Sequence, residues 1–227
     1  MLVMSVLMLA EPKPLRVLVL GDDPMMTGDE ATGSVGYAGL IAPLFDETVT
    51  VEVQTSATLL PNDPVSLLEP AKKGDVVMLC KLPVETPVED MLASDIYLDQ
   101  LLAIQQAAKK KGVKTVWLTP VSPRYYTAEG EQVHRLGQTP VVIRNMCKRD
   151  LLPIIDLEQL TFDWLAQAGA ENTAAAYIPV VPASEVAAEK AAREGNALTE
   201  AGAQKVIELI SEALHADKKN LLNKRLR

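Results

Sequence analysis

The chain has 227 residues, of which 48% are hydrophobic and 23% charged, and its formal net charge at pH 7 is −8. This size and composition predict a globular protein with a sizeable core and exclude an intrinsically disordered one. The acidic balance argues against nucleic-acid binding, which needs clustered lysine and arginine, and no run reaches the roughly 18–20 apolar residues of a membrane span. Two cysteines, Cys80 and Cys147, are too few for a disulfide framework and are expected to be buried free thiols.

The two ends of the chain differ from the rest in composition. Met1 to Ala10 is apolar like the central region of a signal peptide but lacks its basic start. We interpret residues 1–14 as a signal remnant, which favours a periplasmic or extracellular protein; an apolar arm or an extra strand is the alternative. Residues 218–227 are basic, and we interpret them as a frayed helix end rather than a docking site. A single domain is predicted over residues 15–217.

Within that domain, apolar strand-like runs alternate with segments of helical periodicity. Five strands are predicted, at residues 15–20, 48–54, 75–80, 113–118 and 153–156. Helices are predicted at residues 36–45, 64–71, 95–111, 139–150, 157–168 and 199–215, and the stretch 170–196 is expected to be irregular. Ser94, Thr139 and Thr199 are the expected N-caps and Gly112 a C-cap. This alternation predicts a parallel sheet with right-handed crossovers.

Functional groups in such sheets gather beyond the carboxyl ends of the strands. Asp23 follows the first strand, and the turns 55–60 and 81–85 follow the second and third strands. Ala197 lies just before the last helix. We expect these four positions to lie along one edge of the sheet.

Three stretches resemble the motifs of a known superfamily. They are Gly21-Asp22-Asp23 after the first strand, the segment 111–124 (Lys-Gly-Val-Lys-Thr-Val-Trp-Leu-Thr-Pro-Val-Ser-Pro-Arg), and the segment 194–203 (Glu-Gly-Asn-Ala-Leu-Thr-Glu-Ala-Gly-Ala). In order and spacing they are similar to the motifs of SGNH (GDSL-type) hydrolases, most of all the rhamnogalacturonan acetylesterase group. The resemblance covers residues 15–214. It implies a three-layer α/β/α, flavodoxin-like fold with a five-stranded parallel sheet, and a secreted carbohydrate esterase as the ancestral type.

The chain departs from the family at each position that carries the chemistry. Asp23 stands at the position of the nucleophilic serine, and Ala197 at that of the histidine base. Val84 stands at the asparagine that donates to the oxyanion, and Glu194 at the aspartate that orients the histidine. No glycine occurs within residues 40–73 to supply the other oxyanion donor.

The size of these losses decides the prediction. Removal of one oxyanion donor costs about 10²–10³ in rate, and removal of the nucleophile or base costs on the order of 10⁶ in one measured triad. We therefore predict a degenerate domain that is inactive as an esterase and binds a polysaccharide or other glycan, without a cofactor or a metal. The residues expected to bind are Asp22, Asp23, Arg124, Tyr125 and His134, because the resembled family has its sugar site beside the loop of Arg124 and tyrosines stack on sugars. Packing of a tyrosine of this loop in the core is the alternative.

Other interpretations remain at this point. A divergent acetylesterase could use a substitute pair, Ser122 with His134. A cluster of carboxylates, drawn from Asp22, Asp23, Glu85 and Glu194, would suit Mg²⁺ or Ca²⁺. Asp22-Asp23 is also similar to the phospho-acceptor of receiver domains, but Cys80-Lys81 stands where those domains need a further aspartate. Two further interpretations are possible. The carboxylates could form an exposed acidic rim in which Asp22 caps the following turn, or the domain could only bind a protein partner.

Overall fold

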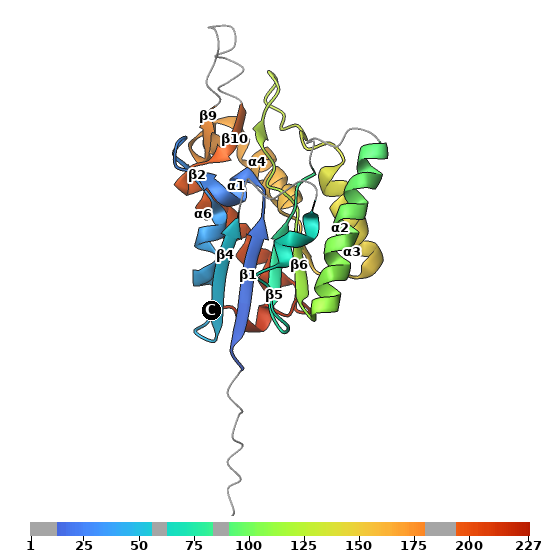
Figure 1. The fold of residues 1–227 in the computed structure, drawn as a ribbon. Coiled ribbons are helices and arrows are strands. Elements are labelled where there is room, and N and C mark those ends of the chain that lie inside the picture. Colours follow the sequence, from blue (N-terminus) through green and yellow to red (C-terminus); the bar gives the residue numbers. More distant parts are fainter. Residues whose placement is uncertain (1–12, 56–62, 84–90, 180–193) are drawn as a thin grey trace, which may run out of the picture.

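The computed structural model describes residues 13–55, 63–83, 91–179 and 194–227. Its centre is a five-stranded parallel sheet in the order β4-β1-β5-β6-β8 (Figure 1). These strands are β1 (Leu15–Gly21), β4 (Val49–Thr55), β5 (Val76–Cys80), β6 (Lys114–Leu118) and β8 (Ile154–Ile155). When these five strands are numbered 1 to 5 in chain order, the sheet reads 2-1-3-4-5, the order of flavodoxin-like folds. The predicted fold class is therefore confirmed.

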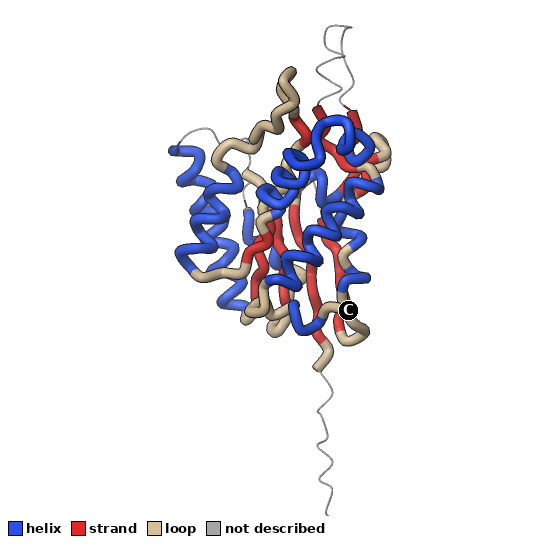
Figure 2. The backbone as a smooth tube through the Cα atoms, turned by 180° about the vertical axis from the view of Figure 1, so that it is seen from behind, coloured by secondary structure: helices blue, strands red, loops and turns tan. Residues whose placement is uncertain are grey.

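Each face of the sheet is covered by its own helical layer. Alternate residues of a strand point to opposite faces, so Val17 and Val19 of β1 join one buried cluster and Leu18 and Leu20 the other. The first cluster is covered by α6 (Glu200–Ala216), α4 (Leu157–Thr173) and the 3₁₀ helices η1 (Tyr37–Leu40) and η2 (Ala42–Leu44), which lie in front of the sheet in Figure 2. The second is covered by α2 (Met91–Lys111), α3 (Thr139–Asp150) and η3 (Pro64–Leu68). Burial on both sides explains the continuous apolar runs in the strands.

The helix ends test the capping predictions individually. Thr199 caps α6 as expected, because its hydroxyl accepts from the amide of Gly202, and Gly112 follows α2 with a φ of +69°. Ser94, however, lies inside α2, which begins three residues earlier. Gln138 rather than Thr139 is the N-cap of α3. The helix predicted at residues 157–168 is present and extends in α4 to Thr173, with a break at Gly169, whose φ is +79°.

Small strands that the sequence pattern did not predict lie over the carboxyl edge of the main sheet (Figure 1). One group is an antiparallel sheet in the order β7-β10-β9, formed by β7 (Arg124–Tyr125), β10 (Glu194–Leu198) and β9 (Tyr177–Pro179). The other is the hairpin of β2 (Gly28–Asp29) and β3 (Ser34–Val35), which follows the short helix α1 (Pro24–Thr27). The expectation of an irregular stretch at 170–196 is thus wrong for its described parts, because strands this short carry too little alternation to be recognised.

The end of the chain is packed, not frayed. After α6 the chain turns back, and Leu222 is fully buried in the core. The guanidinium group of Arg225, in the short helix η5 (Asn223–Arg225), donates to the Thr48 hydroxyl at 2.8 Å, and the Arg227 amide donates to the Leu44 carbonyl at 3.0 Å. The predicted frayed end is therefore wrong. At the other end, Met1–Ala10 lies outside the described residues, among which no helix is long and apolar enough to span a membrane.

A substitution at Leu222 tests this packing. We expect Leu222→Ala to lower the free energy of unfolding by about 2–5 kcal/mol, because it removes a fully buried side chain and leaves a cavity. The matched control Lys219→Ala changes an exposed neighbour and should stay within about 0.5 kcal/mol of the unsubstituted chain. Equal midpoints in urea for both variants would contradict the packed C-terminus.

Candidate functional site

A cavity of about 480 Å³ lies at the carboxyl edge of the sheet. The end of β1, the β2–β3 hairpin, the loop after β6 and strand β10 contribute its walls. Asp23 and Ala197, which come from opposite ends of the sequence, both line it. The other lining residues are Pro24, Met25, Gly28, Asp29, Thr32, Ser34, Leu82, Pro120, Val121, Pro123, Leu136 and Asn196. The fold therefore assembles a hollow at the edge where the sequence placed its candidate residues.

Asp23 is held in the wall of this cavity by main-chain amides. It is 3% exposed and is the N-cap of α1, because one carboxyl oxygen accepts from the Met25 amide at 2.9 Å. The other oxygen accepts from the Val121 amide at 3.4 Å and lies 4.0 Å from the Cys80 sulfur. Asp23, not Asp22, thus caps the turn after β1, and its carboxyl joins β1, α1 and the loop after β6.

Burial sets the acidity of this carboxyl. Desolvation raises the pKa of Asp23 to about 6, although the amides of Met25 and Val121 act in the opposite direction. The nearby charge of Asp22 adds to the rise. A carboxyl in this range exchanges its proton close to neutral pH, which is unusual for aspartate.

The adjacent Asp22 is engaged in an ion pair beside the cavity. Its Oδ2 lies 2.5 Å from the Nζ of Lys81, which is itself 3% exposed, and its Oδ1 accepts from the Leu82 amide at 2.7 Å. The hydroxyl of Tyr97 donates to the Lys81 carbonyl. Asp22 therefore joins the end of β1 to the end of β5.

The cavity wall is acidic, hydroxyl-bearing and apolar. Its charged groups are Asp23 and Asp29, and no lysine, arginine or histidine occurs among the described residues that line it. Thr32, Ser34 and Asn196 supply polar groups, and the remaining lining side chains are apolar, with three prolines among them. This arrangement disfavours an anionic ligand and suits a neutral molecule with both hydroxyl groups and apolar faces.

His134 belongs to a separate cluster. Its ring stacks on Phe162 with centroids 3.7 Å apart, and its Nδ1 lies 2.6 Å from the Oε1 of the buried Glu158. Glu158 also pairs with Arg144, which holds Asp156, the N-cap of α4. These contacts attach the loop of His134 to the first turn of α4, where carboxylates interact favourably with the helix dipole.

Ser122 does not complete a pair with His134. Its amide donates to the Thr161 hydroxyl at 2.9 Å and its own hydroxyl donates to the Pro123 carbonyl at 3.4 Å. Neither Ser122 nor His134 is among the residues that line the cavity. Ser122 and His134 each contact other residues, and they do not form the pair that the divergent-acetylesterase interpretation requires.

The loop that carries Arg124 and Tyr125 is packed against α4. Arg124 is 4% exposed and donates to the Ala170 carbonyl at 2.7 Å. Tyr125 is half-buried, with the guanidinium group of Arg135 4.2 Å from the centre of its ring. The hydroxyl of Tyr126 donates to the Leu165 carbonyl. Packing accounts for Arg124 and Tyr126, whereas Tyr125 remains accessible at the rim of the loop.

The sequence and the structure were compared with those of known proteins. No protein-family model matches the sequence. Over 209 residues the chain is 21% identical to the rhamnogalacturonan acetylesterase RhgT of Bacillus subtilis, with 89% of this chain and 90% of that protein covered. The structure of this chain is similar to that of the acetyl xylan esterase AlAXEase, with a TM-score of 0.61 and 17% sequence identity. The match covers 88% of this chain and 99% of that one.

Two further solved structures have a similar fold. A member of the lipolytic G-D-S-L family from Veillonella parvula has a TM-score of 0.51 and 11% identity, and 91% of this chain and 100% of that one are covered. The protein YxiM of Bacillus subtilis has a TM-score of 0.66 and 16% identity over 90% of this chain, which spans 57% of that protein. This chain has the SGNH hydrolase fold.

Of the four positions that the sequence resemblance aligns with catalytic residues of the family, two lie fully within the described part of the structure. Asp23 and Ala197 line one cavity. Glu194 begins β10 and pairs with Tyr125 in the backbone register, and its side chain is outside the described part of the structure. Val84 and Glu85, like residues 56–60 of the second turn, also lie outside the described residues.

Sequence reasoning missed several lining residues of the SGNH-fold cavity. Thr32 and Ser34 come from the β2–β3 hairpin, and Asn196 comes from β10. Gly28, the first residue of β2, and Gly33, directly before β3, both have positive φ values. Two glycines spaced this way among polar residues are a hairpin signal that the sequence carries. Leu136 had no such signal, because it reaches the cavity only through the packing of the His134 loop.

The buried carboxyl of Asp23 predicts a pH-dependent stability. A folded-state pKa of about 6 against an ordinary 3.8 means that the folded chain binds this proton more tightly than the unfolded chain. The resulting stabilisation is complete below about pH 4 and is lost as the pH rises through about 6. Relative to Asp23→Asn, which cannot titrate, the unsubstituted chain should lose about 2–3 kcal/mol of unfolding free energy between pH 4 and pH 7.

Urea unfolding of both proteins at several pH values in this range checks the expectation. Because the variant shares every other titrating group, the difference between the two curves isolates Asp23. Two parallel pH profiles would show that the carboxyl is not buried as described.

Proposed function

We propose that this SGNH-fold domain binds a neutral glycan in the cavity at its carboxyl edge and does not hydrolyse esters there. The observation that carries the proposal is the state of the two positions that the cavity brings together. Asp23 is a buried helix cap that accepts main-chain amides, and Ala197 offers no atom that could take a proton. These two side chains support a cavity that binds a ligand without the serine and histidine that the resembled family uses as nucleophile and base.

The described cavity wall lacks a group that ester hydrolysis usually needs. Acyl transfer needs a base that removes the proton of the attacking group, and the described lining has no imidazole. His134 is engaged with Glu158 and Phe162. Because loss of the base alone costs on the order of 10⁶ in a serine triad, what remains is the capacity to bind.

The ligand class follows from the wall and from the relatives. RhgT is named a rhamnogalacturonan acetylesterase, and AlAXEase an acetyl xylan esterase. The hydroxyl and amide groups of Thr32, Ser34 and Asn196 can hydrogen-bond sugar hydroxyls, while the prolines and Leu82 offer apolar surface to the faces of sugar rings. The two acidic groups favour an uncharged portion of such a polymer.

A second candidate is a divergent acetylesterase in which Asp23 acts as the base. One observation favours it: a carboxyl in a cavity wall with a pKa of about 6 has the acidity of many general bases. Against it stands the orientation of the carboxyl, whose two oxygens both accept backbone amides.

Ligand binding tests the leading proposal. We expect acetylated xylo-oligosaccharides to bind in isothermal titration calorimetry, and Ala197→Trp to weaken that binding by at least about tenfold because the indole fills the cavity. Ala128→Trp adds the same side chain at an exposed loop position outside the cavity and should bind as the unsubstituted chain does. Binding that is equally strong in both variants would place the ligand elsewhere.

Turnover separates the two candidates. With p-nitrophenyl acetate and acetylated xylan, we expect the release of acetate to match that of Asp23→Asn and of buffer. Activity that Asp23→Asn abolishes, and that rises in the unsubstituted chain as the pH passes about 6, would instead establish the divergent esterase.

A further inference from the structure

The described wall of the cavity offers many hydrogen-bond acceptors and few donors. Its charged side chains, Asp23 and Asp29, are carboxylates, which accept hydrogen bonds when ionised and donate none. The other polar side chains of the described lining are those of Thr32, Ser34 and Asn196. The kind of ligand group that this wall can recognise depends on which of these three side chains still has a hydrogen to donate.

The two hydroxyl groups of the β2–β3 hairpin use their hydrogens within the hairpin. The Thr32 hydroxyl lies 3.1 Å from the Asp29 carbonyl and 3.2 Å from the Ser34 hydroxyl oxygen, and the Ser34 hydroxyl lies 3.4 Å from the same carbonyl. A hydroxyl group carries one hydrogen and two lone pairs. In each arrangement of these bonds both hydrogens stay in the hairpin, and lone pairs remain that can accept a bond from a ligand.

The main chain of the wall is also short of donors. Three of the lining residues are prolines, which have no amide hydrogen. The amides of Met25 and Val121 donate to the Asp23 carboxyl, and the amide of Leu82 donates to Asp22. An ester carbonyl accepts hydrogen bonds, and the oxyanion formed from it needs donors. These parts of the wall are therefore poorly matched to an ester group.

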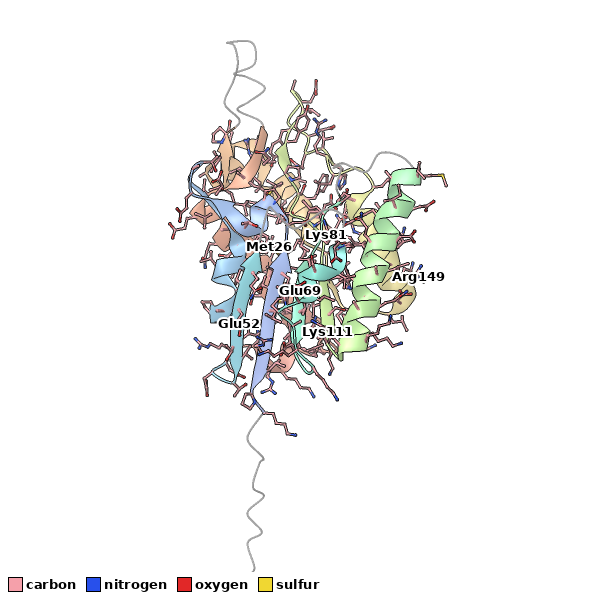
Figure 3. The ribbon with its side chains drawn as sticks, viewed as in Figure 1. Met26, Glu52, Glu69, Lys81, Lys111 and Arg149 are labelled. Carbon is pink, nitrogen blue, oxygen red and sulfur yellow. The ribbon has the colours of Figure 1, made fainter. Side chains whose placement is uncertain are left out.

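The ammonium group of Lys81 does not reverse this balance. Lys81 directly follows β5, near the carboxyl ends of the strands (Figure 3), but it is not among the residues that line the cavity. It is buried, and its ammonium group donates to the Asp22 carboxylate and to the Leu82 carbonyl. The amide of Asn196 is thus the one side-chain donor of the described lining that has no partner among the described residues.

We propose that the cavity binds unesterified sugar units in preference to acetylated ones, through sugar hydroxyls that donate to Asp29 and to the hydroxyl oxygens of the hairpin. A free sugar hydroxyl brings the donor that the wall lacks, whereas acetylation removes that hydrogen and adds a carbonyl, which only accepts. A carbonyl placed against these acceptors would leave them desolvated without a donor. This inference rests on the glycan-binding function proposed above and specifies which form of the glycan is bound.

Asp29 is the specificity-determining residue in this account. Its Oδ1 accepts from the Ala31 amide at 3.0 Å, whereas its Oδ2 has no partner among the described residues. The carboxylate therefore has a free oxygen on a residue that lines the cavity. A hydrogen bond to a charged acceptor is stronger than one between neutral groups, so this oxygen should contribute most to the discrimination.

Isothermal titration calorimetry of the 227-residue chain with one oligosaccharide in two forms tests the preference. The probes are xylohexaose and the same xylohexaose after chemical acetylation. We expect the unacetylated form to bind at least about tenfold more tightly, because the loss of one hydrogen bond to a charged acceptor is sufficient for such a factor.

Asp29→Asn isolates the contribution of the carboxylate. The amide keeps an oxygen that can accept from Ala31, but it replaces the free acceptor with a donor. We expect the variant to bind xylohexaose about tenfold more weakly and acetylated xylohexaose about as well as before. Asp63→Asn is the matched control, because the Oδ1 of the exposed Asp63 also accepts from the amide two residues later, at 3.1 Å, outside the cavity lining. This control should keep the full preference.

Three results would contradict the inference. Equal or tighter binding of the acetylated form, still weakened by Ala197→Trp, would overturn the preference and leave the glycan-binding function standing. No binding of either form, or binding that Ala197→Trp does not change, would overturn the glycan-binding function and the preference with it. Tighter binding of glucosamine oligomers, whose ammonium groups are also donors, would overturn the preference for a neutral sugar in favour of a cationic one.

Discussion

The structure of the candidate site depends on how the carboxyl of Asp23 is satisfied. A buried carboxyl needs hydrogen-bond donors, and those donors come from Met25 in α1 and Val121 in the loop after β6. The side chain that the sequence resemblance aligns with the nucleophile of SGNH hydrolases thereby fixes the positions of two segments around the cavity. A serine at this place would have a shorter side chain with one oxygen, and could not bridge both amides in this way.

A second interaction supports the first. The ion pair between Asp22 and the buried Lys81 joins the carboxyl ends of β1 and β5, so the adjacent acidic residues have different roles. One is paired with an ammonium group and the other is held by neutral amides. Burial of Asp23, whose described donors are neutral amides, raises the pKa of its carboxyl. Among the described residues, no group of three or more histidines, cysteines, aspartates and glutamates is placed to hold a metal ion.

The sequence predicted the fold well because its main signals are long and local. Strands such as β1 and β5 are continuous apolar runs, and Thr199 caps α6 with a side chain of the expected type. The site was harder to predict. That Asp23 and Ala197 share a cavity follows from topology, whereas the β2–β3 hairpin and β9 are two- or three-residue strands with almost no pattern. His134 was placed near the site by its position in a loop, and its contact with Glu158 depends on tertiary packing that no local signal encodes.

The central claim is that Asp23 is a buried structural carboxyl in the wall of a binding cavity. A ¹³C NMR titration of the Asp23 carboxyl carbon, assigned by its absence in Asp23→Asn, measures this state directly. The account predicts a midpoint near pH 6. A midpoint near the ordinary value for aspartate, about pH 4, would contradict it, because such a carboxyl would be open to water.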